Sequence, residues 1–119
     1  MYNPDGWMLV KITSEGKTHY RVFGSWRGGY LDGDSWRLNS GVVRHEEEIV
    51  KNSMNEDLKI YRFYGSSGSC YQVVEKTYGL LGPYNEGVLG SYASQSTDKI
   101  TFEPLQEMPD INSIEWGIE

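Results

Sequence analysis

Residues 6–26, GWMLVKITSEGKTHYRVFGSW, carry apolar side chains at every second position on both sides of a short polar turn. Successive side chains of a strand point to opposite faces, so apolar residues at every second position mark one face. Two such sets flank Ser14-Glu15-Gly16-Lys17, which is typical of a turn: Met8, Val10 and Ile12 before it, and Tyr20, Val22 and Trp26 after it. This stretch predicts a β-hairpin and, with it, a mainly β chain.

The rest of the chain continues the β pattern. Further strands are predicted at Trp36–Glu46, Asp57–Tyr64, Cys70–Thr77 and Lys99–Phe102. The turn Gly65-Ser66-Ser67-Gly68-Ser69 joins two of them as a second hairpin. One short helix is expected over Asn85–Ser94, with Asn85 as its cap. A second helix over Glu46–Met54 is the competing interpretation, but the β-branched pair Ile49-Val50 weakens it. We therefore expect a compact antiparallel sheet, or a small barrel or sandwich, with at most one short helix.

The length of 119 residues predicts a single domain covering residues 1–119. The net charge of −6 is unevenly distributed, because all 11 Lys and Arg lie at or before Lys99 and five of the 17 acidic residues follow it. The remaining 12 acids against 11 bases leave a nearly neutral body and an acidic segment, residues 103–119, which we expect to be extended, with Ile114 and Trp116 as anchors. A neutral body offers no basic stripe, which argues against nonspecific nucleic-acid binding.

Cysteine usage and hydropathy suggest a location. Cys70 is the only cysteine, which rules out a disulfide within the chain and fits a reducing compartment. No basic segment precedes the apolar run Trp7–Val10, and no stretch of eighteen apolar residues occurs. We expect neither a signal peptide nor a membrane span, and an intracellular protein.

The segment Ser25–Gly41, SWRGGYLDGDSWRLNSG, is rich in residues that a simple turn does not need. It contains two Trp-Arg dipeptides, Trp26-Arg27 and Trp36-Arg37. A guanidinium beside an indole suits stacking on bases and a bidentate grip on phosphate or carboxylate. The alternative is structural: neighbouring strand residues face opposite ways, so each Trp would belong to the core and each Arg to the rim. Both interpretations stay open, since the segment predicts either a packed loop or a binding surface.

A binding surface would need further groups around the second dipeptide. The turn at residues 65–69 offers hydroxyls and consecutive amides that can bind an anion. If this turn approaches the Ser25–Gly41 loop, the lip of a cleft forms that suits a small anionic ligand. The candidate ligand-binding residues are Trp26, Arg27, Trp36, Arg37, Ser66, Ser67 and Tyr71.

Motifs for catalysis and metal binding fail on inspection. Asp32-Gly33-Asp34 begins like a calcium loop, but Arg37 stands where that loop needs Gly and Val43 where it needs Glu. The turn at 65–69 lacks the lysine of a phosphate-binding Walker loop. His19, His45 and Cys70 are too scattered for a zinc site, and no GxSxG motif occurs. We expect no catalytic residue, metal or cofactor, and hence no enzyme.

Four segments carry a resemblance: YRVFGSWRGGYLDGDSWRLNSGVVR (20–44), YRFYGSSGSCYQV (61–73), KTYGL (76–80) and EMPD (107–110). The chain resembles a group of small uncharacterised proteins of tailed bacteriophages, from Trp7 to Trp116. The connection Glu46–Glu56 is longer than its counterpart in that group. The resemblance implies a phage origin and carries no site residues.

A phage origin implies a set of roles. Small phage proteins without catalytic motifs are often accessory factors that bind and disable host machinery. We therefore expect a noncatalytic accessory protein in the host cytoplasm that neutralises a host factor, either a defence protein or a small anionic, nucleotide-like signal. Alternatives are a minor virion or assembly protein that self-associates through an exposed strand edge and, less favoured, a small hydrolase or nuclease.

Overall fold

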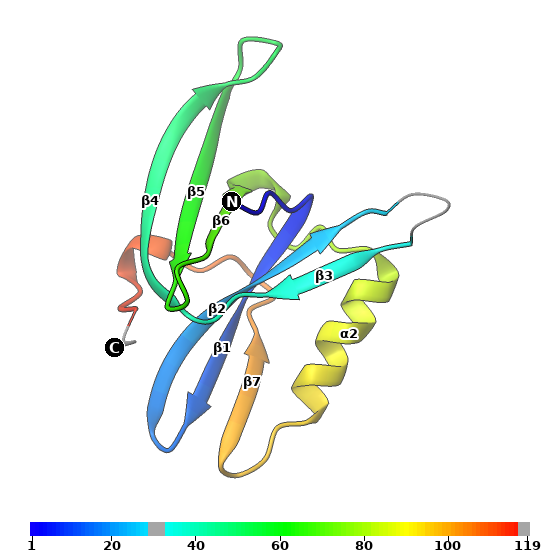
Figure 1. The fold of residues 1–119 in the computed structure, drawn as a ribbon, viewed down its shortest axis with the longest axis vertical. Helices are drawn as coiled ribbons and strands as arrows, with labels where there is room; N and C mark the ends of the chain where they lie inside the picture. The colour runs from blue at the N-terminus through cyan, green and yellow to red at the C-terminus, as the bar shows by residue number, and fades with distance from the viewer. Residues whose placement is uncertain (29–32, 117–119) are drawn as a thin grey trace.

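The computed structural model describes residues 1–28 and 33–116, and it is mainly antiparallel β with one α-helix (Figure 1). Four strands form one sheet in the order β3-β2-β1-β7, and three form a second in the order β4-β5-β6. The strands are β1 (Gly6–Ser14), β2 (Lys17–Trp26), β3 (Ser35–Leu38), β4 (Val42–Lys51), β5 (Asp57–Gly65), β6 (Cys70–Val74) and β7 (Ile100–Pro104). The helix α2 is Pro83–Ser94, and the 3-10 turns η1 and η2 are Glu75–Thr77 and Ile111–Ser113. The predicted fold class is confirmed.

The hairpin β1–β2 forms as its pattern predicts. Ser14 pairs with Lys17, so the loop has two residues, Glu15 and Gly16. Both have positive φ, 53° and 77°, which is the geometry of a type I′ turn. This turn matches the right-handed twist of the strands that it joins and sets the register of the hairpin.

The four-stranded sheet is buried on both sides. Met8 and Val10 point to one side, where they pack with Leu89 of α2. Trp7 and Leu9 point to the other side, where they pack against the three-stranded sheet. The molecule therefore has three layers, with the four-stranded sheet in the middle, α2 on its helix side and β4-β5-β6 on its sheet side. The run Trp7–Val10 is apolar without interruption because β1 contacts a core on each side.

The predicted strand Trp36–Glu46 is wrong, because two strands occupy this segment. β3 ends at Leu38, and β4 begins at Val42 in the other sheet. At the crossing, Asn39 lies beside β2, where its Oδ1 accepts a hydrogen bond from Val22 N at 2.8 Å. Gly41 follows with φ 121°, a conformation that side chains disfavour. The pattern missed the break because both halves are extended.

The second sheet carries the longest projection of the molecule. The hairpin β4–β5 rises above the rest of the structure in Figure 1. Residues 46–51 belong to β4, so the helical alternative over Glu46–Met54 is wrong. The hairpin at residues 65–69 is confirmed, with Gly65 N donating to Ser69 O at 2.8 Å. β6 ends at Val74, three residues earlier than predicted, because the chain turns into η1.

The predicted helix exists, but its cap is not the predicted one. α2 starts at Pro83, with Gly82 as its N-cap. Asn85 lies inside the first turn and is fully buried against the sheet. Its Nδ2 donates to Ser25 Oγ at 2.7 Å and to the Ser35 carbonyl at 2.9 Å. Asn85 therefore fastens the helix to β2 and β3 instead of capping it.

The C-terminal segment returns over the sheet side. It is not wholly extended as expected, because η2 interrupts it and buries Ile111. Ile114 and Trp116 pack against the core of that side, as predicted. Residues 117–119 lie outside the described part of the chain. Within the described residues, no helix has the length and apolar character that a membrane crossing requires.

Candidate ligand-binding groove

The hairpin β2–β3 places its two tryptophans on opposite sides of the sheet. Trp36 pairs with Ser25, the neighbour of Trp26, so the two indoles point in opposite directions. Trp36 stacks on Phe23, with ring centroids 5.6 Å apart and an interplanar angle of 9°. The ring of Tyr92 in α2 meets Trp36 edge-on, also at 5.6 Å. Trp36 is therefore a packing residue of the helix side.

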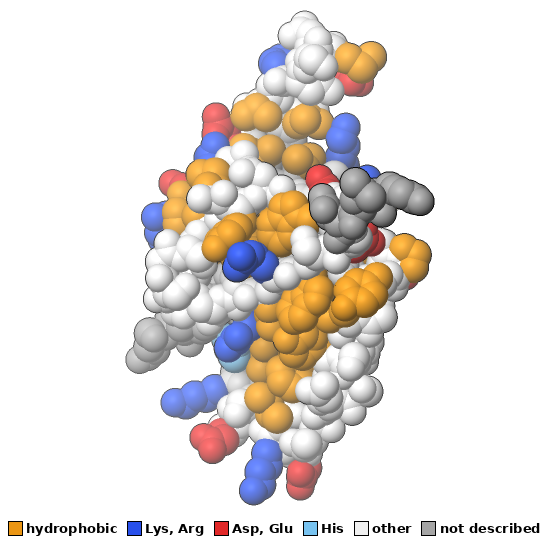
Figure 2. Space-filling model, turned by 45° about the vertical axis from the view of Figure 1, so that its right-hand side comes forward, with side chains coloured by type: hydrophobic (Ala, Val, Ile, Leu, Met, Phe, Trp, Pro, Cys, Tyr) orange, Lys and Arg blue, Asp and Glu red, His pale blue; other side chains and the backbone are white. Residues whose placement is uncertain are grey.

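Apolar side chains remain visible around this contact. Figure 2 shows them gathered in a vertical band on the side of the molecule that carries β3 and α2. A hollow of about 320 Å³ lies there, lined by Trp36, Val88, Ser91, Tyr92 and Gln95. The described residues that line it carry no charged side chain, so this hollow is not a candidate for anion binding.

Trp26 and Arg37 lie together on the opposite side. Arg37 pairs with Gly24, two residues before Trp26, which puts both side chains on the sheet side. The ring of Tyr2 joins them: Arg37 Cζ lies 4.8 Å from its centroid, and Trp26 meets it edge-on at 6.3 Å. An arginine over an aromatic face is attracted by the negative charge of the ring face, so Tyr2 helps to position the guanidinium of Arg37.

Tyr2 is held by its backbone. Its N–H donates to the Cys70 carbonyl at 2.9 Å, and its carbonyl accepts from Gln72 N at 2.8 Å, so it forms a parallel bridge beside β6. Its ring contacts Tyr71, with centroids 4.9 Å apart. Tyr71 is 3% exposed, and this burial raises the pKa of its hydroxyl, an effect that the nearby Arg37 opposes. Tyr71 is therefore a buried residue that packs against the ring of Tyr2.

An open groove of about 610 Å³ lies over these residues. The described residues that line it are Met1, Tyr2, Asn3, Trp26, Ser35, Trp36 and Arg37. Arg37 is the only charged side chain among them. In a chain with a net charge of −6, a groove lined by one charged side chain, a cation, and by three aromatic residues suits a planar group that carries negative charge.

Four predicted site residues do not line this groove: Tyr71, which packs under Tyr2, and Arg27, Ser66 and Ser67. Arg27 is exposed, and only its backbone N–H is tied, to Asp5 Oδ2 at 2.7 Å. The amides of Ser66 and Ser67 donate to Gly41 O and Ser40 Oγ, both at 2.9 Å. The turn at 65–69 does approach the end of the Ser25–Gly41 segment. The amides of Ser66 and Ser67 are hydrogen-bonded to that segment, so they do not face a ligand. The groove centred on Tyr2, Trp26 and Arg37 therefore differs from the predicted cleft, because Ser66 and Ser67 do not line it.

The calcium motif cannot be followed in full, because residues 29–32 lie outside the described part of the chain. Across residues 1–28 and 33–116, no three His, Cys, Asp or Glu side chains come together as a metal site. The two histidines lie in different sheets: His19 of β2 accepts a hydrogen bond from Arg21 Nε at 3.2 Å, and His45 lies in β4.

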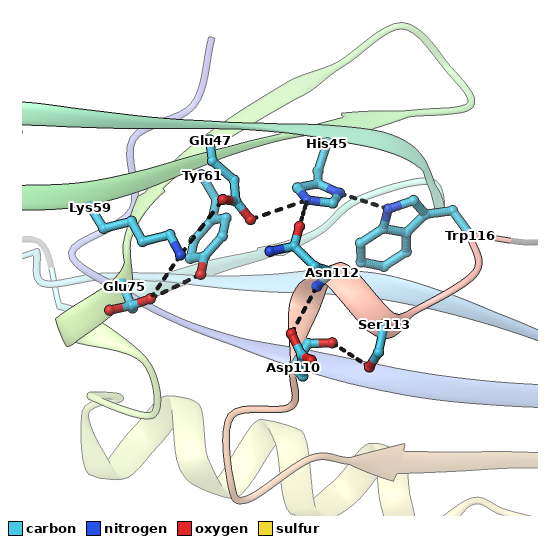
Figure 3. A network of polar contacts seen from close by, with 9 residues as sticks. All are labelled: His45, Glu47, Lys59, Tyr61, Glu75, Asp110, Asn112, Ser113 and Trp116. Carbon is cyan, nitrogen blue, oxygen red and sulfur yellow. Dashed lines mark hydrogen bonds and ion pairs between the residues drawn. The ribbon is translucent and has the colours of Figure 1, made fainter.

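A second polar cluster has a structural role (Figure 3). His45 Nδ1 accepts from Trp116 Nε1 at 2.9 Å, which leaves the ring proton on Nε2, 3.3 Å from Asn112 Oδ1. On the same face, Tyr61 donates to Glu75 at 2.9 Å, and burial raises the pKa of Tyr61. These contacts fasten the C-terminal segment and η1 to the second sheet.

Sequence reasoning missed Tyr2. The residue stands outside every periodic segment, and nothing in its neighbourhood distinguishes it from an exposed terminal aromatic. Its role depends on a backbone bridge to β6, almost seventy residues away, which no local pattern encodes.

Comparison with known proteins identifies no relative: no family model, no curated protein and no solved structure matches this chain.

Proposed function

We propose that this protein is a noncatalytic accessory protein of a tailed bacteriophage that acts in the host cytoplasm. It binds and neutralises a host factor, and the groove over Tyr2 takes a small anionic, nucleotide-like signal. The observation that supports this proposal is the placement of Arg37 over Tyr2 and beside Trp26, in a groove without an acidic side chain among its described lining residues.

Each part of such a ligand has a counterpart in the groove. A base can stack on the exposed parts of the Tyr2 and Trp26 rings, since stacking tolerates any base. The Arg37 guanidinium can pair with a phosphate through two parallel N–H···O bonds. Asn3 adds an amide for hydrogen bonding to the base edge or the sugar. The proposed action is sequestration, because nothing in the groove pairs a nucleophile with a base.

A titration with a panel of mononucleotides and cyclic dinucleotides tests the proposal. Trp26 fluorescence is expected to be quenched when a base stacks on it. Arg37→Ala removes a charge-assisted contact worth about 1.5–3 kcal/mol, so affinity should fall roughly 10- to 150-fold. Arg27→Ala is the matched control, because Arg27 is exposed and does not line the groove.

Native mass spectrometry of the tagged protein from host lysate gives the natural partner. A retained mass of a few hundred daltons, absent from the Arg37→Ala variant, would support sequestration of a small ligand. Retention of a host protein by both forms would overturn the assignment of the groove. Equal affinity of the Arg27 and Arg37 variants for every nucleotide in the panel would do the same.

A further inference from the structure

Several strand edges in the described part of the chain have no neighbouring strand, and two of them are part of β2 and the outer edge of β4. β3 pairs with β2 only from Phe23 to Trp26, so no strand among residues 1–28 and 33–116 lies beside the outer edge of residues 17–21. β4 is the first strand of its sheet, and its outer edge is likewise unpaired within the described residues. In Figure 1 the lower half of β2 and the projecting β4–β5 hairpin are both at the periphery. An unpaired edge presents N–H and C=O groups that can accept another strand.

The direction of the free backbone groups follows from the pairing. Val22 uses its outward N–H and C=O on Asn39, at 2.8 and 3.0 Å, so the alternate residues Thr18 and Tyr20 also direct theirs outward. In β4, Asn52 N bonds to Glu56 O across the hairpin, so Glu47 and Ile49 direct theirs away from β5. Each edge therefore offers at least two consecutive hydrogen-bonding positions.

The two edges carry opposite charge. Lys17 and Arg21 flank the β2 edge, while burial and the neighbouring Arg21 lower the pKa of His19, so its ring is neutral at pH 7. Glu46 and Glu48 lie on one face of the β4 edge, and both are exposed, although each also pairs with an arginine of its own hairpin, Arg44 at 3.9 Å and Arg62 at 2.8 Å. A charged edge protects a strand from its own copies, because like charges then meet. Edges of opposite sign attract each other instead. Within one molecule the two strands do not pair, although Trp116 contacts a side chain of each, Tyr20 of β2 and His45 of β4.

We propose that a second copy of this chain is the occupant: the β2 edge of one molecule pairs antiparallel with the β4 edge of the next. In the register that we propose, Arg21 lies opposite Glu46 and Lys17 lies beside Glu48. Thr18 then faces Ile49, and Tyr20 faces Glu47. The backbone groups of all four residues point outward, so they can form the hydrogen bonds between the two strands. Because the two edges are different surfaces, the contact is head-to-tail and builds a ring or an open filament. This assembly is independent of the ligand groove.

Reciprocal charge reversal tests the pairing. Wild type should sediment above its monomer mass of 13.6 kDa, and added salt should reduce the average mass, because exposed ion pairs are screened. The variants Glu46→Lys/Glu48→Lys and Lys17→Glu/Arg21→Glu should each be monomeric, since each then carries two edges of the same sign. An equimolar mixture of the two should assemble again, because both kinds of contact become complementary between unlike molecules.

A second pair of variants separates strand pairing from simple charge attraction. Glu46 and Glu48 also contact Tyr64 and Arg62 within the hairpin, so their reversal changes the monomer as well. Ile49 is 59% exposed, and Ile49→Pro removes an outward N–H without breaking the bonds to β5. This variant should be monomeric, whereas the matched control Ile49→Thr, which keeps the N–H, should assemble as wild type does.

Each remaining outcome counts against the proposal. A wild-type protein that stays monomeric at every concentration overturns it. Assembly that survives either charge reversal, or that survives Ile49→Pro, shows that another surface is used. A mixture of the two reversed variants that remains monomeric, with both variants folded by circular dichroism, excludes pairing of these two edges.

Discussion

Trp26 and Trp36 lie on adjacent strands, each followed by an arginine, yet they belong to opposite sides of one sheet. Trp36 packs between Phe23 and Tyr92 on the helix side. Its neighbour Arg37 points to the opposite side of the sheet, where it lies over Tyr2 in the groove. Trp26 borders the groove, and its neighbour Arg27 is exposed. The groove is therefore built mainly from the aromatic ring of the first Trp-Arg dipeptide and the cation of the second.

Register produces this difference. In an antiparallel pair, residues directly opposite each other share a face, and Trp36 lies opposite Ser25 instead of Trp26. An offset of one residue thus sends the two indoles apart and brings Trp26 and Arg37 to one side. On the helix side the indole is packed between aromatic rings beside an uncharged hollow, whereas the sheet side keeps an open groove with a cation. Substitutions on the two sides should accordingly affect different properties.

The largest expected effect is on the helix side. Gly6 is buried at the start of β1, and a Cβ there would collide with the backbone carbonyl of Leu80, which leads into α2. Backbone cannot move aside as a side chain can, so Gly6→Ala should cost about 3 kcal/mol or more in denaturant unfolding. Gly87→Ala is the matched control: a Cβ at Gly87 meets nothing within 4 Å, and this change should stabilise the helix by roughly 0.5–1 kcal/mol. Equal stability of the two variants would contradict the close contact between β1 and Leu80.

The two tryptophans should separate stability from binding. Trp36→Ala removes a ring enclosed by two aromatic neighbours and should cost about 2–3 kcal/mol, below the range for fully buried rings because Trp36 is half-buried. Because Trp36 also lines the groove, nucleotide affinity should fall as well, but by less than in Trp26→Ala, since the Trp36 ring is stacked on Phe23 on the helix side. Trp26→Ala should cost less stability, about 1–2 kcal/mol, and should lower affinity by roughly tenfold, in line with the loss of one stacked base.

Denaturant unfolding and a nucleotide titration of both variants provide the measurement. The comparison fails if Trp36→Ala abolishes binding while the protein remains folded, because the two sides would then act as one site.

The smallest expected effect concerns Tyr78, which contacts the cores of both sides. Its hydroxyl donates to Leu105 O at 2.7 Å and accepts from Leu9 N at 3.1 Å. Tyr78→Phe should cost about 1 kcal/mol at pH 7. Burial raises the pKa of Tyr78 to about 12, above its usual value of about 10 in an unfolded chain.

The pH dependence of this effect has a definite sign. A raised pKa favours the protonated hydroxyl in the folded state, so its stabilisation is complete below pH 10 and is lost as the pH rises toward 12. The difference in unfolding free energy between wild type and Tyr78→Phe should therefore shrink over this interval. A difference that stays constant from pH 8 to about pH 12 would show that Tyr78 titrates normally in the folded protein.

Local patterns predicted much of the architecture. The type I′ hairpin at residues 14–17, the hairpin at 65–69 and the helix near residues 85–94 follow from short-range preferences of Gly, Ser and alternating apolar residues. Each signal lies within about ten residues of the structure that it predicts, so no knowledge of distant contacts is needed.

Errors arose where a distant partner determines the local structure. The break between Leu38 and Val42 exists because Asn39 bonds to Val22 in one sheet while the next strand joins another. Asn85 resembles a helix cap, but Ser25 and Ser35 draw its amide into the interior. In both cases an asparagine with several local options is committed by a partner far along the chain.

The amino-acid order alone was sufficient for the fold class, for the positions of the turns and for the presence of an unusual aromatic and arginine segment. Which of those side chains share a surface depended on the register of β2 and β3 and on the parallel bridge between Tyr2 and β6. Alternation along a strand is a local property and can be counted in the sequence. Register and bridges are fixed by contacts between distant residues, so they form only when the two sheets and the helix pack together.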